Sequence, residues 1–86
     1  MTKEQIIPKW FDGGVYASGA TVQNPFSGEK YELNNTEYSM YRYIIHLNDI
    51  IWDKESTPTK KQLSNFQRGL TWFRKNNPEA YYVLLD

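Results

Sequence analysis

Five cationic side chains stand in one stretch of the sequence that contains no acidic residue. The stretch runs from Thr57 to Asn76 and has the helical periodicity described below. Its cations are Lys60, Lys61, Arg68, Arg74 and Lys75. On a helical wheel they lie opposite the apolar positions, and Trp72 falls at the edge of the basic face. Basic groups beside an accessible tryptophan suit a phosphate backbone whose bases stack on the ring.

Two lysines in the first turn of this helix oppose the helix dipole, and an anion bound at the N-terminus would explain them. The alternative is a solvated face that is balanced by acidic neighbours such as Asp53 and Glu55. The chain has 10 basic and 10 acidic residues and a formal net charge of zero. This balance favours the solvated face, because a run of surface charges usually has no role beyond contact with solvent.

His46 is the single histidine, and it belongs to a polar strip at helical spacing. The strip consists of Ser39, Arg42, His46, Asp49 and Asp53. Histidine with carboxylates can carry protons or contribute to a metal site. Because Arg42 disfavours a cation, the strip is better interpreted as solvent-facing charge pairs. No serine occupies a nucleophile turn, and the glycines match no dinucleotide fingerprint. We therefore expect no enzyme, no catalytic residue, no metal ligand and no cofactor.

The segment from Asn24 to Gly28, with the sequence NPFSG, predicts a tight turn. Asn before Pro opens such a turn, and Gly28 can adopt the left-handed conformation that rejoins two strands. Phe26 at its centre has two interpretations. It packs on the core beneath the turn, which we favour, or it is presented to a partner in a recognition loop.

Length and composition indicate one small globular domain. A chain of 86 residues is near the lower limit for a self-sufficient core, although its 16% aromatic content adds buried area. Without cysteine there is neither a disulfide framework nor a thiolate metal site. No segment has the pattern of a signal peptide or of a membrane span, so we expect a cytoplasmic protein that does not contact membranes.

The stretch from Asn34 to Trp52 predicts a central helix over about 35–52. Asn34 is a good N-cap, and Glu37 can complete a capping box. Apolar residues cover most of the circumference, so the helix needs partners on at least two sides. Its first flank contains Tyr38, Tyr41, Ile45 and Trp52, and its second contains Met40, Ile44, Leu47 and Ile51. A homodimer through one flank is an alternative use of this surface.

The remaining predicted elements precede and follow this central helix. One or two hairpins are expected over about 10–33, the first signalled by Asp12-Gly13 and the second by the NPFSG turn. A second helix is expected over about 58–76, with Thr57 as N-cap and Pro58 at its first position. Its core face holds Leu63, Phe66, Leu70 and Phe73, beside a glycine at 69 that suggests close helix approach. A third helix over about 78–85 should be docked. A cap is also conceivable from Thr2 to Gln5.

The segments NPFSGEKYELNNTE and FRKNNPEAYYVLLD resemble small uncharacterised proteins encoded by T4-like tailed phages of marine bacteria. The resemblance covers roughly two-thirds of the chain, from Asn24 to Asp86. It consists of the NPF-x-G turn that leads into a helix start, and of a chain end that contains NPEAY and LLD. It implies a source and a fold, and the host cytoplasm as location, but no catalytic residues.

Together these patterns predict an α+β domain in which N-terminal hairpins pack on a helix pair closed by a short C-terminal helix. The function we expect is that of a non-enzymatic accessory protein that contacts another macromolecule, a protein rather than nucleic acid. Nucleic-acid binding by the helix over 58–76 is the alternative. The candidate binding residues for either are Lys60, Lys61, Arg68, Trp72, Arg74 and Lys75.

Overall fold

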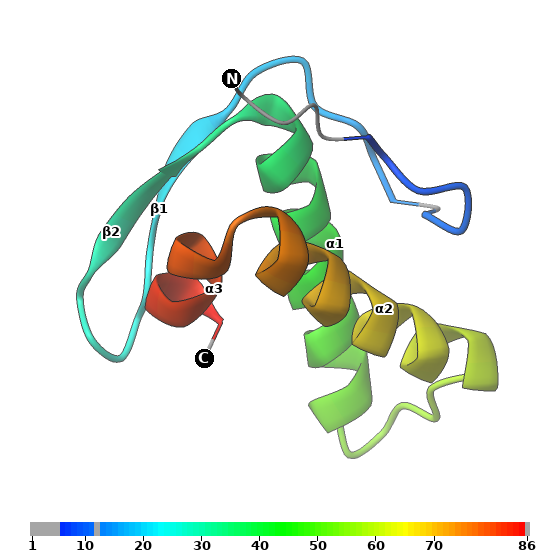
Figure 1. Cartoon of the computed structure of the whole chain (residues 1–86). Helices are drawn as coiled ribbons and strands as arrows, with labels where there is room; N and C mark the ends of the chain where they lie inside the picture. The colour runs from blue at the N-terminus through cyan, green and yellow to red at the C-terminus, as the bar shows by residue number, and fades with distance from the viewer. Residues whose placement is uncertain (1–5, 12, 86) are drawn as a thin grey trace.

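The computed structural model describes residues 6–11 and 13–85, and it shows one β-hairpin followed by three helices. The elements are β1 (Ala20–Gln23), β2 (Lys30–Leu33), α1 (Asn35–Trp52), α2 (Lys60–Asn76) and α3 (Pro78–Leu84). Helix α2 crosses α1, and α3 lies between α2 and the hairpin (Figure 1). The predicted α+β class is therefore confirmed.

The hairpin forms where the NPFSG turn predicts it. Strands β1 and β2 are antiparallel, with Ala20 opposite Leu33 and Gln23 opposite Lys30. Gly28 has φ of 79°, the left-handed conformation expected of it. The Gly28 N–H donates to the Asn24 carbonyl at 2.9 Å, which closes the turn. This part of the prediction is confirmed.

Of the one or two hairpins expected, the described residues contain only the one at the NPFSG turn, and no hairpin is seen at the first signal, Asp12-Gly13. Residues 13–19 form no strand. The turn residue Asp12, like the cap predicted from Thr2 to Gln5, lies outside the described residues. The N-terminal segment instead crosses the helix pair, and Phe11 packs edge-on against Tyr43 of α1 with ring centroids 4.8 Å apart. The aromatic residues that suggested a strand pair are therefore used to cover helices.

Helix α1 begins and ends where the sequence predicts, at 35 and 52. The Asn34 side chain accepts from the Glu37 N–H at 2.8 Å, and the Glu37 carboxylate accepts from the Asn34 N–H at 3.1 Å. The capping box is thus present. The prediction that Ser39 belongs to a solvent-facing strip was wrong. Ser39 is buried, and its hydroxyl donates to the Asn35 carbonyl at 2.7 Å. Its hydroxyl also accepts from the Tyr16 N–H, which ties the N-terminal segment to α1.

Helix α2 begins at Lys60, two residues later than predicted. Thr59 is the N-cap, where we expected Thr57 followed by Pro58 at the first position. The reason is a capping box: the Thr59 hydroxyl accepts from the Gln62 N–H at 3.0 Å, and the Gln62 side chain accepts from the Thr59 N–H at 2.9 Å. Two backbone donors are satisfied at this start.

The face of α2 that meets α1 is also rotated from the predicted one. Its buried residues are Asn65, Gly69 and Phe73, whereas Leu63 is 43% exposed. A Cβ at position 69 would lie 2.9 Å from Ile44 Cγ1, so the close helix approach predicted there is confirmed. The Asn65 side chain donates to the Tyr43 hydroxyl at 3.0 Å. This bond lets a polar residue replace Leu63 on the buried face.

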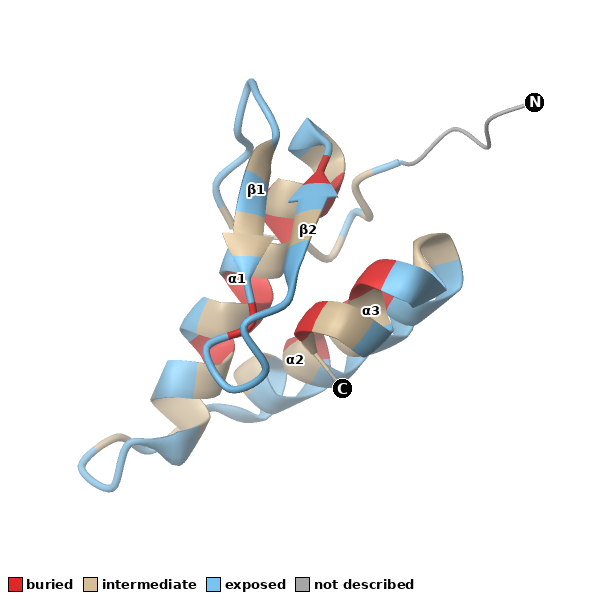
Figure 2. Ribbon diagram, turned by 90° about the vertical axis from the view of Figure 1, so that its left-hand side faces the viewer, coloured by how far each residue is buried: buried red, intermediate tan, exposed pale blue. Residues whose placement is uncertain are grey.

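Helix α3 docks as predicted, with Ala80 and Leu84 buried. Asn77 joins it to the rest of the fold. Its Oδ1 accepts from the Ala80 N–H at 3.2 Å, and its Nδ2 donates to the Glu37 carboxylate at 2.8 Å. Buried positions line the facing sides of the three helices, whereas the tip of the hairpin is exposed (Figure 2).

Candidate functional site

Phe26 projects into solvent from the tip of the hairpin and is 97% exposed. The prediction that it packs on the core was wrong. The turn is held by Asn24, whose side-chain oxygen accepts from the N–H groups of Phe26 at 2.8 Å and Ser27 at 3.3 Å. Its amide nitrogen donates to the Val83 carbonyl at 2.9 Å. Asn24, rather than Phe26, is the buried residue of this turn.

An apolar groove of about 550 Å³ begins beside Phe26. Four elements enclose it: the hairpin turn, α1, α2 and the end of α3. Its apolar lining consists of Pro25, Phe26, Tyr41, Ile44, Ile45, Phe66, Leu70, Leu84 and Leu85. Its polar lining consists of Gln23, Asn24, Asn48 and Asp49. A concave apolar surface with few polar groups is typical of a binding site.

The same apolar surface extends along both helices beyond the groove. On α1, Trp52 follows Ile45 by seven residues and so lies on the same flank. On α2, Leu63 precedes Phe66 by three residues, one turn earlier. Trp52 is 76% exposed and Leu63 is 43% exposed. Among the described residues, Trp52 at the end of this α1 flank is therefore left largely uncovered.

Among the described residues that line the groove, Asp49 is the one that is charged, and it contributes a negative charge. No basic residue lies in the last turn of α1, where the helix dipole adds negative potential. Tyr41 forms part of the wall. Burial raises its pKa above the ordinary tyrosine value, although the charge of Arg42 acts in the opposite direction. At neutral pH the Tyr41 hydroxyl is therefore a neutral hydrogen-bonding group.

The five cations of α2 are all exposed, but they do not form one cluster. Lys61, Arg68 and Lys75 follow each other at intervals of seven residues and line one side of the helix. Lys60 and Arg74 lie on the other side of the exposed face. The Arg74 guanidinium lies 5.7 Å from the centroid of the Tyr81 ring, a cation–π distance.

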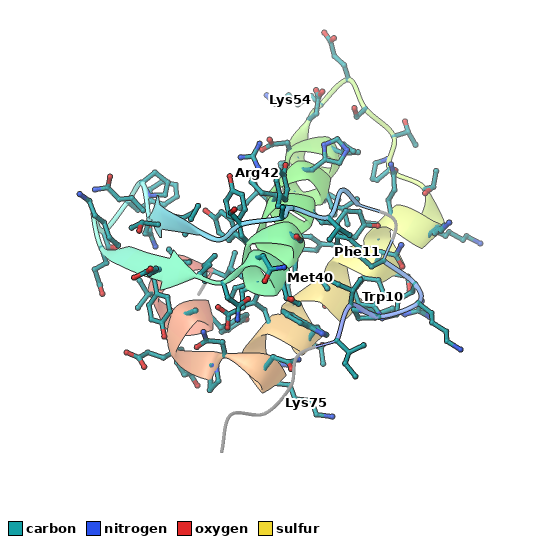
Figure 3. The ribbon with its side chains drawn as sticks, turned by 90° about the horizontal axis from the view of Figure 1, so that it is seen from above. Trp10, Phe11, Met40, Arg42, Lys54 and Lys75 are labelled. Carbon is teal, nitrogen blue, oxygen red and sulfur yellow. The ribbon has the colours of Figure 1, made fainter. Side chains whose placement is uncertain are left out.

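Trp72 lies beside the line of Lys61, Arg68 and Lys75, as predicted, but it is half-buried. Its indole N–H donates to the Ile6 carbonyl at 3.2 Å. A shallow recess of about 360 Å³ separates it from Trp10 of the N-terminal segment, and Gln67, Arg68 and Thr71 complete the lining. Trp10 lies alongside α2 (Figure 3).

His46 is exposed, as are Arg42, Asp49 and Asp53 of its strip. The Arg42 guanidinium donates a hydrogen bond to the Tyr16 side chain, which raises the pKa of Arg42 and keeps this side chain cationic. Among residues 6–11 and 13–85, no three His, Asp or Glu side chains are placed to hold a metal ion. In the same part of the chain, no helix is both long and apolar enough to cross a membrane.

Sequence reasoning missed two of the residues that shape these surfaces. Asn24 was assigned to the turn, but it also bonds Val83, which lies 59 positions later in the sequence. No local sequence pattern signals such a distant bond. Trp10 was attributed to a hairpin of which the described residues show no strand. The adjacent large aromatic residues Trp10 and Phe11 were the available signal, since both pack against helices far along the chain.

Comparison with known proteins adds no relative: no family model, no curated protein and no solved structure matches this chain. The resemblance to small proteins of T4-like tailed phages stays a prediction. The surfaces described above are therefore what supports a function.

Proposed function

We propose that this chain is a non-enzymatic module that binds a partner protein in the groove beside Phe26. The observation that carries the proposal is an aromatic side chain 97% exposed at the rim of an apolar groove. Such a ring gains nothing from its position in the free protein. When a partner buries it, a phenylalanine side chain contributes about 1.5–3 kcal/mol to the free energy of binding. Aromatic residues are also frequent anchors of interfaces.

The turn presents Phe26 in a fixed conformation before any partner binds. Asn24 bonds the backbone N–H groups of Phe26 and Ser27 and is itself tethered to α3 through Val83. Binding therefore has little backbone entropy to lose at this point. This distinguishes Phe26 from exposed apolar residues that stand alone on a surface.

The lining of the groove indicates the chemistry of the partner. Its walls are helices with apolar residues at helical spacing, a form that accepts the apolar face of an amphipathic helix. Asp49 is the one charged residue among the described residues of the lining, and it lies near the C-terminal end of α1, where the helix dipole is negative. A partner helix with a lysine or arginine at that end would complement it.

A photocrosslinking experiment in the cells that produce the protein tests the proposal. A benzophenone amino acid replaces Phe26 in one variant and Val15 in the other; Val15 is a matched control because it is also exposed, at 67%, outside the groove. We expect a discrete protein adduct from position 26 that Ile45→Asp abolishes. Equal adducts from both positions, or none from position 26, would refute the groove as the binding site.

Once the crosslinked protein is known, Phe26→Ala measures the contribution of the ring. We expect the substitution to reduce the free energy of binding by about 1.5–3 kcal/mol, which corresponds to a Kd about 10- to 150-fold higher. An affinity unchanged by this substitution would contradict the role of Phe26 as an anchor.

A further inference from the structure

We propose that the other exposed face of α2 binds single-stranded nucleic acid, with a base inserted between Trp10 and Trp72. This inference is independent of the proposed function, since neither tryptophan lines the groove beside Phe26. It rests on two features of the structure, a line of cations and an aromatic recess.

The line of cations consists of Lys61, Arg68 and Lys75. All three are exposed, and their spacing of seven residues repeats about every 10 Å along the helix axis. The sequence of helix α2 itself contains no acidic residue. A row of cations at regular intervals fits a polyanion that runs along the helix, rather than one isolated anion.

The charge of the whole chain is also segregated. The chain has 10 basic and 10 acidic residues, and α2 holds five of the basic ones and none of the acidic ones. The residues outside α2 therefore carry a net charge of −5. A polyanion is directed to the α2 face although the molecule as a whole is neutral.

The recess lies within this line of cations, because Arg68 is both a cation of the line and part of the recess lining. The Trp72 N–H already donates to the Ile6 carbonyl, so the ring offers a ligand its apolar surface rather than a donor. Trp10 lines the same recess and provides a second aromatic surface. Stacking on such rings accepts any base, but it requires a base that is not paired in a duplex.

The experiment titrates the full chain into a fluorescein-labelled oligothymidylate of 12 nucleotides. Binding is followed by fluorescence anisotropy at several salt concentrations. Contacts from three cations predict a log–log slope of affinity against salt of about −2 for a single strand. Arg68→Ala and Lys75→Ala should each reduce that slope by about 0.7. Lys54→Ala is the matched control, since Figure 3 shows Lys54 far from Trp10 and Lys75, and it should leave the slope unchanged.

The tryptophans are tested separately from the charge. Trp10→Ala should weaken binding about 5- to 150-fold, the range for loss of one stacked base, without changing the salt slope. Trp10→Phe keeps an aromatic surface and should restore most of the affinity. Phe26→Ala should leave binding unchanged, so failure here and failure of the groove proposal are distinguishable.

Three outcomes would overturn the inference. They are no binding at low salt, equal or tighter binding of a 12-base-pair duplex, and an effect of Lys54→Ala as large as that of Arg68→Ala. Low salt is the decisive condition, because the attraction between exposed charges is least screened there.

Discussion

The bond from Asn24 to α3 gives the most exacting test of the fold. Asn24→Asp keeps the oxygen that accepts from Phe26 and Ser27 but removes the N–H that donates to the Val83 carbonyl at 2.9 Å. Because Asn24 is buried, that carbonyl would face a carboxylate with little access to water. We expect a loss of about 1–3 kcal/mol in the free energy of unfolding, the cost of an unsatisfied buried group.

Asn24→Ala removes all three bonds and should cost more, roughly 2–4 kcal/mol. The assay is urea unfolding followed by circular dichroism, with the free energy extrapolated to water. Gln23→Ala is the matched control, since the Gln23 side chain bonds the Gly28 carbonyl at 3.1 Å but is exposed. It should change stability by less than about 0.5 kcal/mol. If Asn24→Asp is as mild as this control, the tether to α3 does not exist in solution.

Three further substitutions test the packing, each by the same unfolding assay. Tyr43→Phe removes the hydroxyl that accepts from the Asn65 amide and should lower the free energy of unfolding by about 1–3 kcal/mol. No change in stability would mean that water reaches Asn65. Gly69→Ala places a methyl group 2.9 Å from Ile44 Cγ1, and overpacking of about 1–3 kcal/mol should outweigh the gain of about 1 kcal/mol in helix propensity. Stabilisation by this change would contradict the close contact. Gly19→Ala drives a Cβ into the backbone at the end of β2 and should be the most damaging of the three.

The parts of the fold that were predicted correctly depend on local signals. The Asn34 cap, the Gly28 turn and the proline after Asn77 each act within a few residues, so the chain itself specifies them. The start of α2 was misplaced because two cap signals stand side by side, and the reciprocal box at Thr59 prevailed over proline at the first position. The Gln62 side chain completes that box by accepting from the Thr59 N–H.

The errors on the candidate sites have a different origin. Periodicity placed Leu63 on the core face, but the close approach at Gly69 and the bond from Asn65 to Tyr43 set the rotation of α2. Phe26 was expected to be buried because residue type was the only guide. Both outcomes depend on partners far along the chain, which a single sequence does not reveal. The basic side of α2 needed no such partner and was placed correctly on the surface.

Asn77 has a consequence for how the domain opens. Its one amide caps α3, bonds the Glu37 carboxylate of α1, and receives the Tyr31 hydroxyl of β2 at 3.4 Å. A short terminal helix would ordinarily fray far more often than the whole domain unfolds. Here fraying would also strip Glu37 and Tyr31 of a partner, so α3 should open together with the hairpin and α1. We expect its amides to exchange with solvent deuterium almost as slowly as those at the centre of α1.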